Sequence, residues 1–387
     1  MEPIPAGKPD ASAFLGVVGD YHIGHYGAVE VVRARLHPEL RGNDPEVLEA
    51  LAAWGGEVHV EDDEDGANVV LIRPTESARD RWWVHVALLL ATLLTTLAAG
   101  ALLQGVDPVR TVFYPIGKSS LLPVPTGIDP RALWRGALFA LPFLGILLAH
   151  ESGHYLAARR HRVPVTLPFF IPFPPWYSLV GTLGAFIRIK GPTVRRSVLL
   201  DIAAAGPLAS FLLSLPALLI GLALSEPAAG TASAATPFMI RFASESVHIG
   251  NGPLLHVLGL LYFPDTFGSV PILLHPLAFA GWLGLFITAL NLLPLGQLDG
   301  GHILYCLWGQ PRQVRAARLF VVALVPLGLV WWGWWLWGGA ALLVNRGRLS
   351  HPPVLQPTRP LDPLRALAAY AAILIFFLTF VPIPLSM

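Results

Sequence analysis

Six long apolar segments separated by short polar stretches dominate the chain after residue 80. They run over about 82–106, 132–160, 197–224, 274–296, 319–344 and 364–384. About twenty consecutive apolar residues cross a bilayer as a helix, so the pattern predicts a mainly α, polytopic membrane helix bundle. The fifth segment fits either one tilted helix or two short helices that turn near Gly333. The bundle is therefore expected to have six to seven spans.

Residues 1–80 follow a different pattern. The stretch 27–36 alternates like a half-buried strand, and 43–54 reads as a short helix with Asp44 as N-cap and Pro45 at its first position. Two further strands are expected in "GEVHVED" and "NVVLIRP". We expect a soluble N-terminal α+β domain at 1–80, followed by the membrane domain at 81–387. Three histidines of the first half are interpreted as surface residues, with a metal site as the alternative: His22, His25 and His37.

The composition supports a membrane protein. Hydrophobic residues make up 54% and charged residues 13% of the 387 residues, whereas soluble domains carry about 25% charge. The formal net charge of +1 argues against a nucleic-acid partner, and the single Cys306 excludes an internal disulfide. The partners implied are the lipid bilayer and other proteins, and the oligomeric state is left open.

Source and orientation are inferred from composition and from the arginines. Abundant Arg and Ala, and a start without signal-peptide or transit-peptide character, favour a multi-pass protein of a bacterial cell membrane. Arginine clusters at 159–162, 188–196, 312–318 and 346–365 share one side if 319–344 crosses twice. This scheme makes the N-terminal domain cytoplasmic, although the basic residues at 110–135 oppose it.

The sequence "HESGH" at 150–154 lies at the end of the second apolar segment. Residues i and i+4 share one face of a helix, so His150 and His154 are spaced to bind one Zn²⁺, and Glu151 is placed as general base toward water. Ionisable groups are expensive at membrane depth, at roughly 2.5–3.5 kcal/mol each. Such a cost is expected only where the groups have a function.

A third protein ligand is normal in a catalytic zinc site, and few acids lie in or beside the apolar segments. Asp201 opens the third segment and is expected at its rim. Asp299 lies in "ALNLLPLGQLDGGH", where Pro294 and Gly296 stop a helix. Irregular backbone at membrane depth has to line a cavity or be buried in protein.

The combination of H-E-x-x-H with N-x-x-P-x-x-x-x-D-G resembles the site-2 protease family of intramembrane zinc metalloproteases. Residues 275–302 and 179–192 are similar to the bacterial and plastid branch that carries an N-terminal soluble domain. The resemblance implies His150, His154 and Asp299 as ligands of one Zn²⁺ per chain and Glu151 as the catalytic base. It also implies Asn291 near the substrate carbonyl. An Asn amide can stabilise an oxyanion, with a helix–helix hydrogen bond as the alternative.

The stretch 163–190 is rich in Pro and aromatic residues and becomes strand-like from Leu179. Its four prolines forbid a helix, and an unpaired strand beside the zinc would hold an extended peptide by β-augmentation. The expected element is a small membrane-associated β-hairpin with an edge strand, and an ordinary interfacial hairpin is the alternative. His302, one turn beyond Asp299, is left as a neighbour of the ligands, a ligand or an interfacial residue.

The function expected is hydrolysis of peptide bonds in transmembrane-helix substrates, as in regulated intramembrane proteolysis. Two alternatives remain open: a membrane metal-ion transporter that uses the same histidines, and a catalytically inactive family member that binds substrates. The transporter is disfavoured because the sequence shows one broken element and no internal repeat. The inactive member is disfavoured by the intact Glu151.

Overall fold

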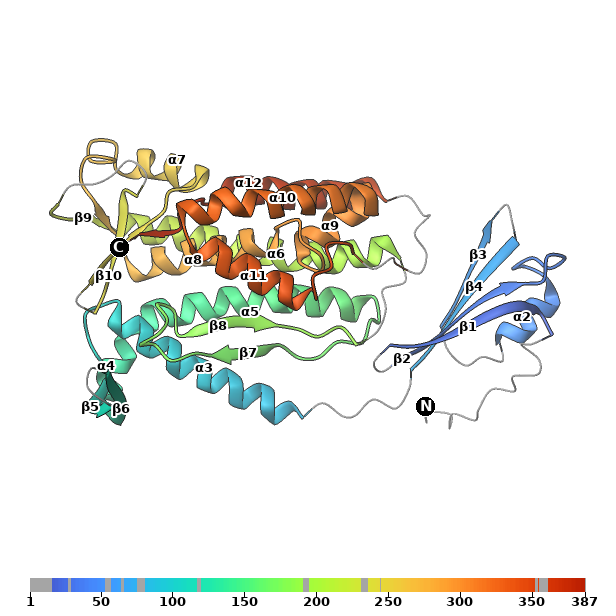
Figure 1. Cartoon of the computed structure of the whole chain (residues 1–387), viewed down its shortest axis with the longest axis horizontal. Helices are drawn as coiled ribbons and strands as arrows, with labels where there is room; N and C mark the ends of the chain where they lie inside the picture. Colours follow the sequence, from blue (N-terminus) through green and yellow to red (C-terminus); the bar gives the residue numbers. More distant parts are fainter. Residues whose placement is uncertain are drawn as a thin grey trace.

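The computed structural model describes residues 16–26, 29–52, 57–63, 66–74, 81–116, 120–190, 195–230, 236–243, 245–351, 354 and 361–386. The N-terminal part forms an antiparallel sheet of order β1-β2-β4-β3 with one helix (Figure 1). Its elements are β1 Val18–Tyr26, β2 Val29–Leu36, α2 Pro45–Ala52, β3 Glu57–Asp63 and β4 Gly66–Pro74. The predicted helix and three strands are confirmed. The N-terminal part therefore has the α+β content that was predicted. A domain boundary at residue 80 stays a prediction.

The remainder is a helix bundle with small β elements at one end and, as β7 and β8, along its flank (Figure 1). The helices are α3 Trp82–Leu102, α4 Pro130–Arg135, α5 Ala137–Arg160, α6 Arg196–Ala223, α7 Pro253–Tyr262, α8 Pro276–Asn291, α9 Asp299–Trp308, α10 Gln310–Val330, α11 Gly333–Val344 and α12 Pro363–Thr379. Each of the six predicted apolar segments contains a helix. Sequence reasoning missed α9 as a separate helix.

The number of crossings is confirmed only in part. Among the described helices, α3, α6 and α10 are long and apolar enough to cross a membrane by length and composition. Helix α5 has 24 residues but includes the polar H-E-x-x-H stretch and two arginines, and α7, α8 and α12 are shorter apolar helices. Six to seven spans are therefore not confirmed.

Residues 319–344 form a helical hairpin, as one of the two predicted alternatives had it. Helix α10 ends at Val330 and α11 begins at Gly333. The Nε2 of Gln313, near the start of α10, donates to the carbonyl of Leu349 just beyond α11, at 2.9 Å. The start of α10 and the end of α11 therefore lie at the same end of the hairpin.

The β elements beside the bundle were foreseen only in part. The hairpin β5 Val109–Ile116 and β6 Ser120–Ile128 and a five-stranded sheet of order β13-β11-β10-β12-β9 were missed. The strands of that sheet are β9 Glu226–Pro227, β10 Phe238–Phe242, β11 Glu245–Ile249, β12 Ile272–Leu273 and β13 Leu385–Ser386. Segments of two to five residues are too short for periodicity to reveal. The predicted hairpin in 163–190 exists as β7 Phe169–Pro172 paired with β8 Thr182–Phe186.

Helices α5, α6 and α8 pack closely around the centre of the bundle. A Cβ on Gly153 of α5 would lie 2.5 Å from the Ala205 carbonyl oxygen of α6, and a Cβ on Gly281 of α8 would lie 2.5 Å from the Leu218 nitrogen of α6. Glycine at these crossings lets the backbones approach, as in other membrane bundles. The three helices therefore hold fixed relative positions.

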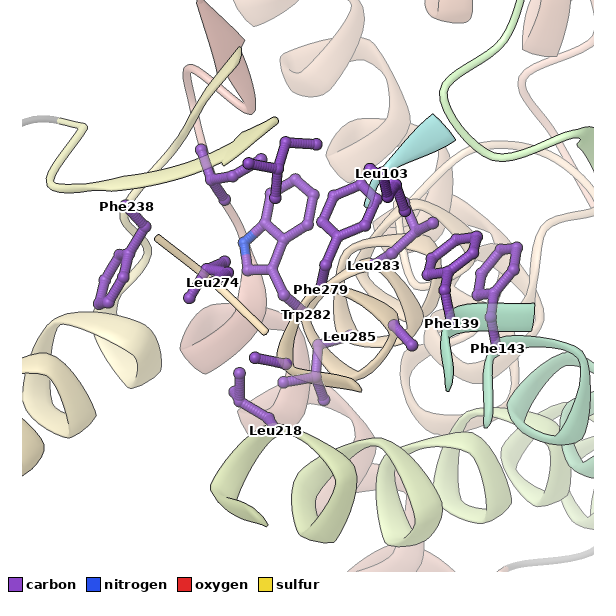
Figure 2. Packing of buried hydrophobic residues seen from close by; sticks show 14 of the residues in the cluster. Leu103, Phe139, Phe143, Leu218, Phe238, Leu274, Phe279, Trp282, Leu283 and Leu285 are labelled. Atoms are coloured by element: carbon purple, nitrogen blue, oxygen red, sulfur yellow. The ribbon is translucent and has the colours of Figure 1, made fainter. Parts of the chain in front are cut away.

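An aromatic ladder joins α5 to α8 on one side of this contact (Figure 2). Phe139 stacks on Phe279 at 5.4 Å between ring centroids, and Trp282 continues the ladder to Phe286 at 5.5 Å. Offset aromatic pairs add roughly 0.5–1.5 kcal/mol each beyond their buried area. The ladder stabilises the contact between the N-terminal halves of α5 and α8, before these helices reach His150 and Asn291.

Replacing Gly281 by alanine should destabilise the bundle, because the added methyl group meets the α6 backbone. Backbone atoms cannot move aside as a side chain does, so we expect a loss of about 1–3 kcal/mol and a lower Tm in detergent. Gly145 of α5 is the matched control, since its Cβ would meet nothing within 4 Å. Gly145→Ala should leave the Tm unchanged or raise it; equal losses in both variants would contradict the close-contact explanation.

The helical hairpin predicts a shared membrane side for two arginine clusters. In a Cys306→Ser background, Arg312→Cys and Arg346→Cys should react with a membrane-impermeant maleimide from the same side. Val257→Cys, exposed on α7, serves as the reference for the other end. Labelling of positions 312 and 346 from opposite sides would rule out the hairpin as the membrane-embedded arrangement.

Candidate metal centre

Helix α5 presents two imidazoles and one carboxylate from consecutive turns. His150 and His154 are 4% and 8% exposed, and their Nε2 atoms lie 3.1 Å apart. Glu151, beside the first histidine, is also buried. The predicted i, i+4 pairing is therefore present in the fold, at the end of an otherwise apolar helix.

Asp299 reaches the same point from the first residue of α9. Its Oδ2 lies 3.4 Å from the Nε2 of His150 and 3.4 Å from the Nε2 of His154. The chain leaves α8 at Asn291, and Gly296 adopts φ +40° before α9 begins. The predicted break between the two helices is present, and it delivers the carboxylate to the histidines.

Glycines allow the tight return of the chain from α8 into α9. A Cβ on Gly300 would lie 1.9 Å from the Leu292 carbonyl oxygen, and one on Gly301 would lie 2.5 Å from that of Gly296. Any side chain at these positions would push α9 away from the preceding loop. Close packing against the preceding loop therefore explains why glycine occupies the two positions after Asp299.

Helix α6 fixes both imidazole rings through their Nδ1 atoms. The Nδ1 of His154 lies 2.7 Å from the carbonyl oxygen of Ile202, and the Nδ1 of His150 lies 3.1 Å from the Oγ of Ser210. A carbonyl only accepts, so His154 carries its proton on Nδ1 and turns the lone pair of Nε2 toward Asp299. Such hydrogen bonds to the far ring nitrogen are typical of metal-binding histidines.

Ser210 is itself tied to α8. Its Oγ lies 2.8 Å from the Oγ1 of Thr288, and Thr288 donates to the carbonyl of Gly284 at 2.7 Å. Sequence reasoning missed Ser210, Thr288 and Ile202. Polar residues within an apolar segment were the available signal, but Ser and Thr also bond to their own helix backbone.

The donor set fits a zinc ion. The structure describes one group of three or more His, Cys, Asp or Glu whose donor atoms all lie within 4.8 Å of one another: His150, His154 and Asp299. Ligands at 2.0–2.1 Å in a tetrahedron stand about 3.3 Å apart, close to the 3.1, 3.4 and 3.4 Å separations of these donors. Nitrogen and oxygen ligands with both Nδ1 atoms anchored match zinc chemistry.

Asn291 and Glu151 face a cavity of about 330 Å³ beside the donors. The Nδ2 of Asn291 lies 3.2 Å from the Nε2 of His150 on α5, so this amide of α8 reaches the donor group. The backbone N–H of Ile187, directly after β8, lies close to the Glu151 carboxylate. The remaining walls come mostly from apolar residues of α5 and α8, with Thr182 to Ala185 of β8 and Trp337 of α11.

Other ionisable residues lie apart from the donor group. Asp201 accepts from His161 at 2.8 Å and from Arg365 at 2.9 Å, which joins α5, α6 and α12 at the rim, as expected for this aspartate. The His302 ring packs against His351 at 4.7 Å between centroids and does not join the three donors. In the N-terminal part, His22 and His37 are exposed, and the side chain of His25 lies outside the described residues.

Comparisons with known proteins agree with this geometry. The family model described as Peptidase family M50 matches residues 138–330. "Probable zinc metalloprotease EGY1, chloroplastic" from Oryza sativa subsp. japonica is 31% identical over 316 residues, covering 78% of this chain and 51% of that protein. The protein of that name from Arabidopsis thaliana is 33% identical over 252 residues, covering 62% and 42%.

A further relative and the solved structures complete the comparison. "Probable zinc metalloprotease EGY2, chloroplastic" from Oryza sativa subsp. indica is 32% identical over 267 residues, covering 68% of this chain and 44% of that protein. The chain thus spans about half the length of these curated relatives. No solved structure matches the chain significantly.

The prediction of a bacterial cell membrane is wrong. The relatives are plant proteins named as chloroplastic, so the cytoplasmic side assigned to residues 1–80 also loses its basis. An apolar span has the same composition in any bilayer, and an excess of Arg and Ala reflects codon usage rather than a compartment.

The match of the family model includes the H-E-x-x-H helix and all residues up to Asp299 and α9. The individual roles of Glu151 and Asn291, and of the three donors as ligands, remain predictions supported by position. With the donor geometry, the family model and the named relatives in agreement, the chain belongs to the site-2 protease family, peptidase family M50.

Proposed function

We propose that the chain is an intramembrane zinc endopeptidase that hydrolyses peptide bonds of transmembrane-helix substrates. The observation that carries the proposal is the convergence of His150, His154 and Asp299 within 4.8 Å, next to a buried Glu151 and a cavity of about 330 Å³. The relatives are named as zinc metalloproteases, which supports zinc-dependent peptide hydrolysis. They are also named as chloroplastic, which favours a plastid membrane as the location.

The three donors would hold zinc, which when bound supplies Lewis-acid activation of a water and of the scissile carbonyl. Glu151 takes the proton from the attacking water as the new carbon–oxygen bond forms, and passes it to the leaving nitrogen as the carbon–nitrogen bond breaks. The N–H of Ile187 lies close to the Glu151 carboxylate and favours its charged form.

Asn291 is placed to stabilise the negative charge that develops on the substrate carbonyl oxygen. Its Nδ2 lies at the donor group, 3.2 Å from the Nε2 of His150. A preorganised amide donor at such a place contributes about 2.7–4 kcal/mol in other hydrolases. The same contact joins α8 to α5, so the alternative of a helix–helix hydrogen bond stays open beside the oxyanion role.

The strand β8 is proposed to hold the substrate in an extended form. Within the described residues, β8 pairs with β7 alone. Beyond the strand, the N–H of Lys190 donates to the carbonyl of Pro164, and the carbonyl of Arg188 accepts from the N–H of Thr166. Both bonds lie on the β7 side. Strand alternation then directs the N–H groups of Ile187 and Ala185 to the opposite edge. At this edge the N–H of Ile187 lies close to the Glu151 carboxylate.

Purified protein should bind about one zinc per chain. Substitutions of the ligands should lower the zinc content, whereas substitution of the base should lower cleavage alone. His150→Ala and Asp299→Ala should lose most of the metal, because two remaining donors bind zinc weakly. Glu151→Gln should retain zinc and lose cleavage by at least about 100-fold. Metal content is measured by atomic absorption, and cleavage with a model transmembrane substrate in liposomes.

The same variants discriminate the alternative functions. A metal-ion transporter would show zinc flux into the liposomes and no cleavage, and an inactive family member would bind the substrate without cutting it. Normal cleavage by Glu151→Gln would show that Glu151 is not the base.

Ala185→Pro should reduce cleavage by about 10-fold or more, because proline removes the N–H that faces the substrate. Ala185→Val keeps this donor and should have a milder effect. Phe186→Pro tests the register: Phe186 opposes Phe169 of β7, so this variant should loosen the hairpin itself. Zinc content should stay the same in all three. Wild-type cleavage by Ala185→Pro would mean that β8 does not hold the substrate.

A further inference from the structure

The segment that follows α11 is bound to the loop that carries Asp299. We call residues 345–351 the strap. Helix α11 ends in a reversal in which Arg346 and Gly347 both adopt positive φ, 52° and 70°, and the N–H of Gly347 bonds the carbonyl of Leu342 at 2.8 Å. A non-glycine residue in this region costs roughly 1–2 kcal/mol. Such strain persists only where the surroundings fix the backbone.

Two glutamine side chains of α10 hold the second half of the strap. Gln313, which is fully buried, donates to the carbonyl of Leu349 at 2.9 Å and accepts from the N–H of His351 at 3.2 Å. Gln310 donates to the carbonyl of His351 at 3.2 Å. Both polar ends of the Gln313 amide thus form hydrogen bonds with the strap. These bonds fix the position of the strap, in addition to its apolar packing.

The ring of His351 packs into the same region. It stacks on Tyr305 of α9 at 4.4 Å between centroids and lies edge-on to His302 at 4.7 Å. Just beyond the strap, the N–H of Val354 donates to the hydroxyl of Tyr305 at 3.0 Å. Helix α9, which begins with Asp299, is therefore covered by the strap along one side.

The contact nearest to the metal centre is made by Asn345. Its Oδ1 accepts from the backbone N–H of Gln297 at 2.9 Å, two residues before Asp299, and its Nδ2 donates to the carbonyl of Ala341 at 2.9 Å. The side chain is 7% exposed. One amide thus joins the last turn of α11 to the loop between α8 and α9.

The loop is shaped to receive this amide. Gly296 has φ +40°, and a Cβ there would lie 2.4 Å from the Oδ1 of Asn345 and 3.1 Å from the carbonyl oxygen of Arg348. The glycine leaves room for the strap directly against the loop backbone. Without that contact, the N–H of Gln297 would lose this hydrogen-bond partner, and the loop would lose its bond to α11.

We propose that Asn345 is a positioning residue for the metal centre, which acts through the Gln297 N–H to hold Asp299 against His150 and His154. The inference rests on the proposed role of Asp299 as a zinc ligand. It assigns to the α10–α11 hairpin and its strap the task of fixing the third ligand, whereas α6 fixes the two histidines.

The test uses the full chain in nanodiscs and measures the rate at which zinc is lost to an excess of a chromogenic chelator. Asn345→Ala should release zinc about 10 times faster than the wild type or more, within the range of affinity losses on removal of groups that support metal ligands. Asn345→Asp keeps the acceptor oxygen for Gln297 and should restore most of the retention. Gln313→Leu loosens the strap and should fall between these two. Asn251→Ala removes another side-chain amide bond, to His256 on α7, and should leave zinc release unchanged.

Hydrogen exchange of the metal-free protein gives a readout independent of zinc. Amides of residues 292–303 should exchange faster in Asn345→Ala than in the wild type, and Asn251→Ala should leave them unchanged. Wild-type zinc release and wild-type exchange in both Asn345→Ala and Gln313→Leu would overturn the positioning role and leave the proposed function standing. Absence of zinc from the wild-type protein would instead overturn the proposed function, while the exchange data would still decide whether Asn345 holds the loop.

Discussion

The close approach of α5, α6 and α8 is the constraint on which the rest of the structure depends. Glycines at the crossings bring the backbones together, and only at such a distance do Ile202 and Ser210 of α6 reach the Nδ1 atoms of His154 and His150. Polar side chains inside an apolar bundle have no water to bond, so each needs a protein partner. A series of hydrogen bonds from Thr288 to Ser210 and from Ser210 to His150 supplies such partners. The same packing that stabilises the bundle therefore orients the donors.

The metal centre is assembled from helices with different supports. The two histidines come from one continuous helix that α6 braces over its length, so their spacing follows from helix geometry. Asp299 instead follows an interrupted stretch whose backbone turns through Gly296. Irregular backbone at this depth has to be satisfied by protein, and the amide of Asn345 provides one such bond. The aspartate is thus the donor whose position depends most on remote contacts.

Strand β8 forms one wall of the cavity beside the donors. A helical peptide protects its carbonyl groups by internal hydrogen bonds, whereas hydrolysis needs an accessible carbonyl. A strand with an open edge beside Glu151 offers backbone partners to an unwound segment. The apolar residues that line the cavity suit the side chains of a membrane-spanning substrate, which connects the architecture to the proposed reaction.

The sequence by itself determined the helix bundle, the α+β part, the hairpin in 163–190 and the three donors. Long apolar runs, the i, i+4 histidines and the lone aspartate at a helix break are local patterns with direct physical meaning. It did not determine Ser210 or Thr288, because serine and threonine in an apolar helix look alike whether they bond their own backbone or another helix. Nor did it determine Ile202, which contributes a backbone carbonyl that every residue has, or Asn345, whose partner lies 48 residues away. Nor did it reveal the five-stranded sheet, whose strands are too short to show a period. Only the tertiary structure decided which polar atoms meet, since contacts across 48 to 141 residues of sequence arise from packing and not from any local pattern.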